Sequence, residues 1–172
     1  MDFVEDLRSY ARHDCHSVVL CHRIIEKVGE EHSYIRLYSK LVGELRKVKV
    51  GEGKLPFRSV FVERLQGLFY EWVRNGEWEG REEQYKKQLL GVSLFVGELV
   101  HWGVITRKIF PDCFYELAHA YARQYYAFSH LSNFYYHETY IECITKIIQK
   151  MGKQYDKLLE KAPHSSVEGV VE

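Results

Sequence analysis

The strongest constraint on the fold is an almost continuously apolar segment, residues 86–103, near the middle of the chain. Its large apolar side chains recur at helical spacing and leave only a narrow small or polar stripe, which predicts a helix buried on most sides. A helix that spans a bilayer needs about 20 apolar residues, and this one is shorter and interrupted. We therefore expect other helices of the same chain to surround it. The apolar positions are Leu89, Val92, Phe95, Val96, Leu99 and Trp102, and the stripe is Ser93, Gly97 and His101.

The apolar pattern predicts further helices, separated by turn residues and short polar runs. We expect them over residues 34–45, 57–74 and 138–160, and over residues 3–28 as one helix or as two that break near residues 13–16. Another opens at Thr106 or at Pro111, where the proline predicts a short preceding turn or a kink. No segment alternates with period two for long enough to demand a strand. The expected fold is all-α, an α-solenoid of about three antiparallel, HEAT-like helical hairpins.

Composition and charge limit the functional classes. The 172 residues carry 24 basic and 24 acidic side chains, so binding to nucleic acid or to an anionic membrane would have to come from a local patch. The four cysteines are scattered without a CxxC pair, which favours reduced thiols over a disulfide framework. The first twelve residues are charged and contain no apolar run, so we expect no signal peptide. The expected protein is soluble and cytoplasmic, with one domain over residues 1–161 and a flexible tail over residues 162–172.

No pattern in the sequence indicates an enzyme, a cofactor or a metal site. Histidines and cysteines cluster between residues 13 and 22, but on a helix they point around the axis instead of toward one ion. Residues 51–54 lack the GxxxxGK[ST] spacing of a phosphate loop and are interpreted as a turn. Glu98 and His101 lie about one helical turn apart, and we favour a packing or surface role over an acid–base pair. We expect a chain that catalyses no reaction and binds no metal ion, cofactor or small-molecule substrate.

Several blocks of residues occur together in one order and spacing. They are Phe57, Gln66 and Phe69, then Gly91, Phe95, Gly97, Glu98 and Leu99, and finally Cys143 and Gly152. This combination resembles the middle domain of the translation initiation factor 4G scaffold, and the likeness covers about residues 18–160. In that resemblance these positions form the structural signature of the helices.

The resemblance implies a HEAT-type solenoid that binds other molecules and performs no chemistry. It implies a scaffold module of translation initiation that holds a DEAD-box RNA helicase of the initiation factor 4A type and, secondarily, RNA. The same domain type serves mRNA decay, splicing and poly(A)-binding-protein regulation, so an RNA-binding or adaptor module of one of these pathways is the alternative. Because the family continues with further helices, we expect a domain shortened at its C-terminal end.

Partner surfaces of solenoids are commonly built from the turns between helices and from one exposed face. We therefore expect the helicase to contact the turns of the first two predicted hairpins. The candidates, chosen by position, are Glu30, Glu31 and His32 in the first turn and Arg74, Asn75, Glu77 and Trp78 in the second.

Two groups of basic residues are candidates for salt-dependent RNA binding, and a solvated helix face is the alternative for the second group. The first group is Arg46, Lys47, Lys49, Lys54 and Arg58, and the second is Lys146, Lys150, Lys153 and Lys157. Residues 121–136 are rich in aromatic side chains, which we expect to pack between helices in preference to stacking on unpaired bases. If these side chains lie exposed, they indicate a protein contact.

Overall fold

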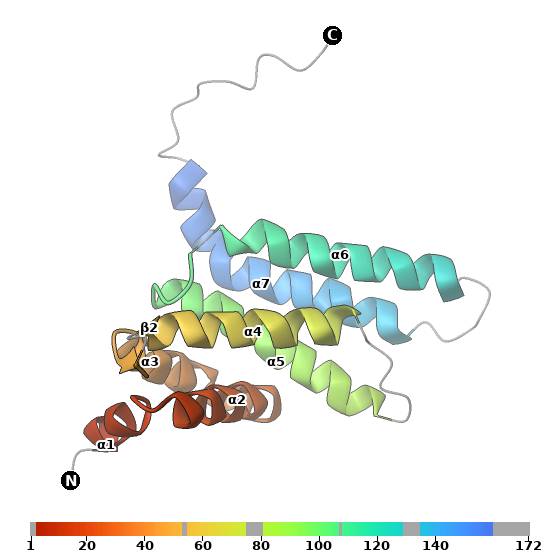
Figure 1. Ribbon diagram of the computed structural model, residues 1–172. Coiled ribbons are helices and arrows are strands. Elements are labelled where there is room, and N and C mark those ends of the chain that lie inside the picture. The colour runs from red at the N-terminus through yellow and green to blue at the C-terminus, as the bar shows by residue number, and fades with distance from the viewer. Residues whose placement is uncertain (1–2, 53–54, 75–80, 107, 129–134, 160–172) are drawn as a thin grey trace.

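The computed structural model describes residues 3–52, 55–74, 81–106, 108–128 and 135–159 (Figure 1). The expected tail, residues 162–172, lies outside these ranges, so the domain boundary stays a prediction. The elements in chain order are α1 (Phe3–Tyr10), α2 (Asp14–Glu30), the 3-10 helix η1 (His32–Tyr34), α3 (Ile35–Leu45), β1 (Lys49–Val50), β2 (Leu55–Pro56), α4 (Phe57–Arg74), α5 (Glu82–His101), α6 (Ile109–Phe128) and α7 (Tyr135–Leu159).

The long helices form three antiparallel hairpins that stack side by side, which confirms the expected all-α solenoid. Helices α2, α4 and α6 follow one another in one layer, and α3, α5 and α7 follow one another in the second layer. The C-terminal ends of α2, α4 and α6 and the N-terminal ends of α3, α5 and α7 lie toward one edge of the stack, at the right of Figure 1, and the opposite ends of these helices lie toward the other edge. We call these the turn edge and the connection edge.

The segment 3–28 is two helices, as one of the two stated alternatives predicted, because the chain bends between Tyr10 and Asp14. Local details differ from the sequence expectations in two places. The connection after α3 contains two very short antiparallel strands, with Lys49 paired to Pro56 and Val50 to Leu55, where no strand was expected. Pro111 occupies the first turn of α6, where the missing N–H has no intrahelical partner to lose, so no kink is required.

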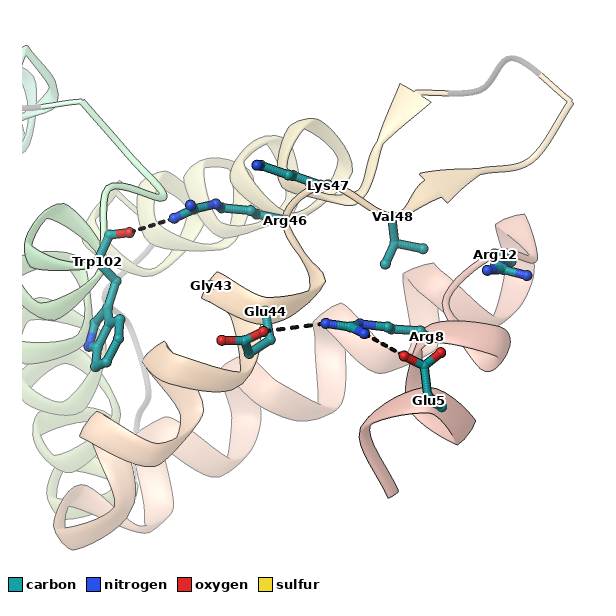
Figure 2. A pocket seen from close by; sticks show the side chains of 9 residues that line it. All are labelled: Glu5, Arg8, Arg12, Gly43, Glu44, Arg46, Lys47, Val48 and Trp102. Atoms are coloured by element: carbon teal, nitrogen blue, oxygen red, sulfur yellow. Dashed lines mark hydrogen bonds and ion pairs between the residues drawn. The ribbon is translucent and has the colours of Figure 1, made fainter. Parts of the chain in front are cut away.

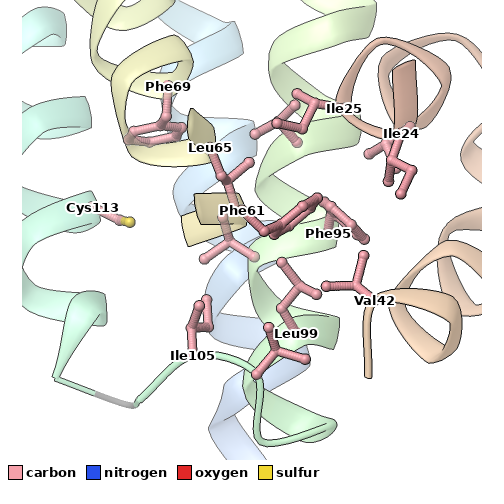
Figure 3. Close-up of a cluster of buried hydrophobic side chains, with 14 of the residues drawn as sticks. Ile24, Ile25, Val42, Phe61, Leu65, Phe69, Phe95, Leu99, Ile105 and Cys113 are labelled. Atoms are coloured by element: carbon pink, nitrogen blue, oxygen red, sulfur yellow. The ribbon is translucent and has the colours of Figure 1, made fainter. Parts of the chain in front are cut away.

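Helix α5 is the central helix of the stack and is buried on most sides, as its sequence predicts. It packs against α2 and α3 on one side and against α7 on the other. Leu89, Val92, Phe95 and Leu99 are fully buried, and the Phe95 ring meets the edge of the Phe61 ring from α4 at a centroid distance of 6.0 Å (Figure 3). Among the described residues, no helix has both the length and the apolar character to cross a membrane.

Two glycines let α2 and α5 approach each other closely. A Cβ atom on Gly91 would lie 2.5 Å from the carbonyl oxygen of Val28, and a Cβ atom on Gly29 would lie 2.9 Å from Cγ of Gln88. Distances this short are not compatible with larger side chains. Residue 91, one of the positions that resemble the family, is therefore a glycine because the close packing of α2 and α5 leaves no room for a larger side chain.

A chain of hydrogen bonds joins the second and third hairpins inside the core. The hydroxyl of Tyr85 on α5 donates to the backbone carbonyl of Trp72 on α4, at 2.9 Å, and lies 3.1 Å from the hydroxyl of Tyr140 on α7. Gln124 of α6 donates to the Tyr140 hydroxyl at 3.2 Å. Each buried hydroxyl therefore has partners, which avoids the cost of burying an unpaired polar group.

Replacing Gly91 with alanine is expected to destabilise the fold. The added methyl group would collide with the Val28 carbonyl, so α2 and α5 must move apart. We expect the free energy of unfolding to fall by about 1–3 kcal/mol. Urea denaturation followed by circular dichroism measures this change.

The matched control is Gly67→Ala in α4, where no atom lies within 4 Å of the new side chain. That variant should be unchanged or more stable by up to about 1 kcal/mol, because alanine favours a helix more than glycine does. If Gly91→Ala were as stable as Gly67→Ala, the close approach of α2 and α5 would be contradicted.

Candidate functional site

A basic stripe runs along the exposed face of α3. Arg36 and Lys40 are one turn apart on the helix, and Lys47 lies just beyond its end on the same face, with Gly43 between them. All three cationic side chains are exposed. The stripe belongs to the layer of α3, α5 and α7. Of its three cations, sequence reasoning selected only Lys47.

A small hollow of about 240 Å³ lies beside this stripe, between α3, α5 and α7. It is lined by Arg36 from α3, by Gly97, Glu98 and His101 from α5, and by Lys150 from α7. Two of these five residues, Arg36 and Lys150, are cationic. Lys150 of α7 and Arg36 of the basic stripe therefore meet at one surface.

Glu98 and Lys150 form an ion pair in this hollow. The Lys150 Nζ donates to Glu98 Oε1 at 2.5 Å, and Glu98 is only 6% exposed. Gly97 makes the pair possible, since a Cβ atom there would lie 2.6 Å from the Cβ atom of Lys150. Glu98 and Gly97 thus hold α7 against α5, and the ion pair with Lys150 gives Glu98 a packing role.

A larger cleft of about 640 Å³ lies at the connection edge, between α1, the end of α3 and the end of α5. Figure 2 shows Trp102 at one end and Arg8 and Arg12 at the other, with Gly43 of α3 between them. Arg8 is held by Glu5 at 2.5 Å and by Glu44 at 3.4 Å. The cleft is also lined by Arg46, Lys47 and Val48.

Two arginines predicted to bind RNA also stabilise the end of α5. Arg46 donates to the carbonyl of Trp102 at 3.0 Å, and Arg58 donates to the carbonyl of Val104. Cationic donors are favourable at the C-terminal end of a helix, where carbonyl groups lack intrahelical partners. These side chains therefore have a structural role besides any contact with RNA.

Two of the remaining predicted RNA-binding residues have described side chains, and they line neither the cleft nor the hollow. Lys49 is exposed in β1, and Lys146 is half-buried on α7. Lys54 lies outside the described residues, and Lys153 and Lys157 lie outside those whose side chains are described. Gly152 of the family-like set falls in that last range too.

The turn of the first hairpin is bonded to its own fold. Glu31 accepts hydrogen bonds from Tyr38 at 2.7 Å and from Lys27 at 3.1 Å, and these bonds hold the pKa of Glu31 below its ordinary value. A ring nitrogen of His32 lies 2.8 Å from the carbonyl of Lys87 on α5. Glu30 is exposed but pairs with Lys27. Two of the three predicted contact residues therefore also hold the hairpin turn in place.

Arg74 at the second hairpin turn has a similar structural role. Its guanidinium donates twice to Glu116 of α6, at 2.8 and 3.2 Å, and lies 4.9 Å from the centre of the Tyr70 ring. The Arg74 hydrogen bonds lower the pKa of Glu116. The other three residues predicted for this turn, Asn75, Glu77 and Trp78, lie outside the described part of the chain.

The aromatic side chains of α6 correct one expectation. Tyr121 is half-buried and packs on the core, but Tyr125 is 44% exposed and Tyr126 is 79% exposed. Packing between helices is therefore wrong for these two residues, which are exposed near the C-terminal end of α6. Their exposure instead favours the alternative interpretation, in which these aromatic side chains contact a protein partner.

Most of the family-like residues are structural. Phe57, Phe69, Phe95, Leu99 and Cys143 are buried in the core. Burial raises the pKa of the Cys143 thiol to about 12, so this thiol stays protonated at neutral pH. Gln66 is the exception, since it is exposed and donates to the Tyr70 hydroxyl at 3.2 Å.

The histidines and cysteines near the start of α2 do not converge. Cys21 is buried, Cys15 is exposed, and the His16 ring stacks on Tyr10 at a centroid distance of 4.3 Å. Within the described ranges, no group of three or more metal-ligating side chains is placed to hold a metal ion.

Sequence reasoning missed Arg8, Arg12, Arg36, Lys40 and Trp102. Arg36 and Lys40 carried a usable signal, because with Lys47 they repeat on one helical face of an otherwise neutral chain. Arg8, Arg12 and Trp102 carried no such signal in the sequence, because only tertiary packing brings α1 next to the end of α5.

One family model, described as the MIF4G domain, matches residues 7–166 of the chain. The comparison with curated proteins found no match, and neither did the comparison with solved structures. The matched range contains every residue that lines the hollow and all the cleft residues except Glu5.

Removal of Lys150 should leave the buried Glu98 carboxylate without its partner. We expect Lys150→Ala to lower the free energy of unfolding by about 1–3 kcal/mol, as measured by urea denaturation. Lys146→Ala, one turn earlier on α7, should change it by less than about 0.5 kcal/mol.

The double variant Glu98→Gln, Lys150→Ala separates the charge effect from lost packing. A neutral amide costs less to bury than an unpaired carboxylate, so we expect the double variant to recover at least part of the loss. A double variant less stable than Lys150→Ala would argue against the ion pair.

Proposed function

Because the chain belongs to the MIF4G domain family, the family of the initiation factor 4G middle domain, we propose that it is a non-enzymatic scaffold of translation initiation. Domains of this family are helical modules that mediate protein and RNA interactions, and the chain is accordingly a scaffold or adaptor module in translation or RNA metabolism. In our proposal its protein partner is a DEAD-box RNA helicase of the initiation factor 4A type, its second partner is RNA, and it acts in the cytoplasm. The family match over residues 7–166 is the observation that carries the proposal.

The separation of two surfaces supports binding of both partners at once. The cleft, with Arg12, Arg46 and Lys47, lies at the connection edge, whereas the C-terminal ends of α2, α4 and α6 lie toward the opposite edge (Figure 1). A protein on the turn edge would leave the cleft and the Lys47 end of the stripe open to RNA. A scaffold that holds a helicase close to its RNA needs this arrangement.

We place the helicase contact on the turn edge, with exposed aromatic side chains as its anchors. Tyr34 follows the first turn and is 55% exposed, and Tyr126 lies near the end of α6. Aromatic side chains are enriched among the residues that contribute most to binding energy. Glu30 of the sequence-predicted set is exposed and is kept as a contact residue, whereas Glu31, His32 and Arg74 serve mainly to position the turns.

We place RNA on the stripe of α3 and the adjacent hollow. Arg36, Lys40 and Lys150 supply positive charge on one surface without the net charge that would attract nucleic acid everywhere. Contacts of this type bind phosphates and weaken as salt concentration rises. An RNA-binding or adaptor module of mRNA decay, splicing or poly(A)-binding-protein regulation would use the same surface and is the alternative.

The helicase proposal predicts stimulation of the partner. With RNA present, the ATPase rate of the factor 4A helicase from the same cell should rise saturably as the chain is added. The double variant Tyr34→Ala, Tyr126→Ala should weaken this interaction about 5- to 30-fold, because each lost anchor is worth roughly 1 kcal/mol or more.

The control for the helicase experiment is Leu55→Ala, which removes an equally exposed apolar side chain from the connection edge. It should leave helicase binding unchanged. If the chain captured no DEAD-box helicase of its cell, the partner assignment would fail.

The RNA proposal predicts salt-dependent binding that needs α3. Arg36→Glu with Lys40→Glu should weaken binding of single-stranded RNA at least about tenfold at low salt and reduce the slope of log K against log salt by about 1.4, or about 0.7 for each lost phosphate contact. Fluorescence anisotropy measures both quantities. Lys87→Glu, an exposed lysine of α5 near the turn edge, is the control, and an equal loss there would argue against a localised RNA surface.

A further inference from the structure

The cleft at the connection edge differs from the rest of the basic surface because it is a hollow with an aromatic wall. Its volume of about 640 Å³ falls in the range of about 300–1,000 Å³ that is usual for sites of small ligands. The stripe of α3, by contrast, presents exposed side chains on a helix face. The cleft can therefore surround a chemical group.

The charge of the cleft favours an anion. Four cationic side chains line it against the two carboxylates of Glu5 and Glu44, and both carboxylates bind Arg8. Arg12 and Lys47 are exposed and have no ion-pair partner among the described residues. Arg46 uses one nitrogen for the Trp102 carbonyl, which orients its guanidinium and leaves its other donors available.

Gly43 keeps the cleft open. It lies on α3 between Trp102 and Arg8 in Figure 2, and a Cβ atom there would be 3.9 Å from Cβ and Cε3 of Trp102. That distance is an ordinary van der Waals contact, so a side chain at residue 43 would be tolerated by the fold but would occupy the cleft. Trp102 is half-buried and forms the aromatic end of the cleft.

We propose that this cleft takes an unpaired segment of RNA, with one base against Trp102 and the flanking phosphates at Arg46 and Lys47 and at Arg12. An aromatic side chain offers a stacking surface to any unpaired base, whereas a base inside a duplex is already stacked on its neighbours. Cations at both ends of the cleft match the successive phosphates of one strand. The inference rests on the RNA-binding part of the proposed function and assigns its base-contacting site.

The test compares three labelled probes by fluorescence anisotropy with the full chain: a hexauridylate RNA, an abasic hexamer with the same phosphates, and a hexaglutamate peptide. Base stacking is worth about 1–3 kcal/mol, so the RNA should bind roughly 5- to 150-fold more tightly than the abasic strand. Equal binding of the two strands, or tighter binding of the peptide, would overturn the assignment.

Gly43→Met fills the cleft, and Gly67→Met is its matched control on α4, where nothing lies within 4 Å of the new side chain. We expect Gly43→Met to bind hexauridylate about tenfold more weakly and to lose the preference for bases, and we expect Gly67→Met to bind as the wild type does. The exposed double variant Arg12→Glu, Lys47→Glu provides a second test that does not depend on folding around residue 43. Its loss of affinity should appear with both strands.

The outcomes separate this inference from the proposed function. If Gly43→Met binds as the wild type does while Arg36→Glu with Lys40→Glu loses RNA, the cleft assignment is wrong and RNA binding by α3 stands. If the wild-type chain binds neither strand, the RNA-binding part of the proposed function fails together with the cleft.

Discussion

The close approach of α2 and α5 at Gly29 and Gly91 is the constraint on which the rest of the structure depends. Because no side chain separates the two helices there, α5 sits deep in the stack, with α2 and α3 on one side and α7 on the other. A helix in this position needs apolar residues on most of its surface. Gly97 permits a similar close approach on the opposite side of α5, where Lys150 of α7 lies near enough to pair with Glu98.

The end of α5 connects this core to the basic surface. Gly103, with a backbone φ of 66°, turns the chain out of the helix, and the carbonyls of the following turn accept hydrogen bonds from Arg46 and Arg58. Guanidinium groups have five donors, so the same side chains stabilise the helix end and keep donors for a phosphate. The cleft forms where Trp102, the first residue after α5, meets Gly43 of α3.

The antiparallel hairpins divide the functions between two edges. The helix ends that flank the hairpin turns lie toward the turn edge, and the opposite helix ends lie toward the connection edge. Residues that are far apart in the sequence therefore come close together when they occupy equivalent positions in their hairpins. Tyr34 and Tyr126 are far apart in the chain but both follow or precede a hairpin turn. Lys47 and Trp102 likewise lie in the connections between hairpins, and they meet Arg12, from the bend between α1 and α2, at the opposite edge.

The sequence by itself determined the all-helical class, the three hairpins and the burial of α5, because apolar spacing at Leu89, Val92 and Leu99 depends only on helical geometry. It also identified the residues that resemble the family, including Gly91, whose role the structure then explained. Only the tertiary structure decided which faces meet solvent: Tyr125 and Tyr126 look like core residues in the sequence, yet both are exposed near the end of α6. The sequence could not predict the cleft either, because Arg8 and Trp102 line one cleft only through the packing of three helices. No local sequence pattern specifies how close these two residues lie.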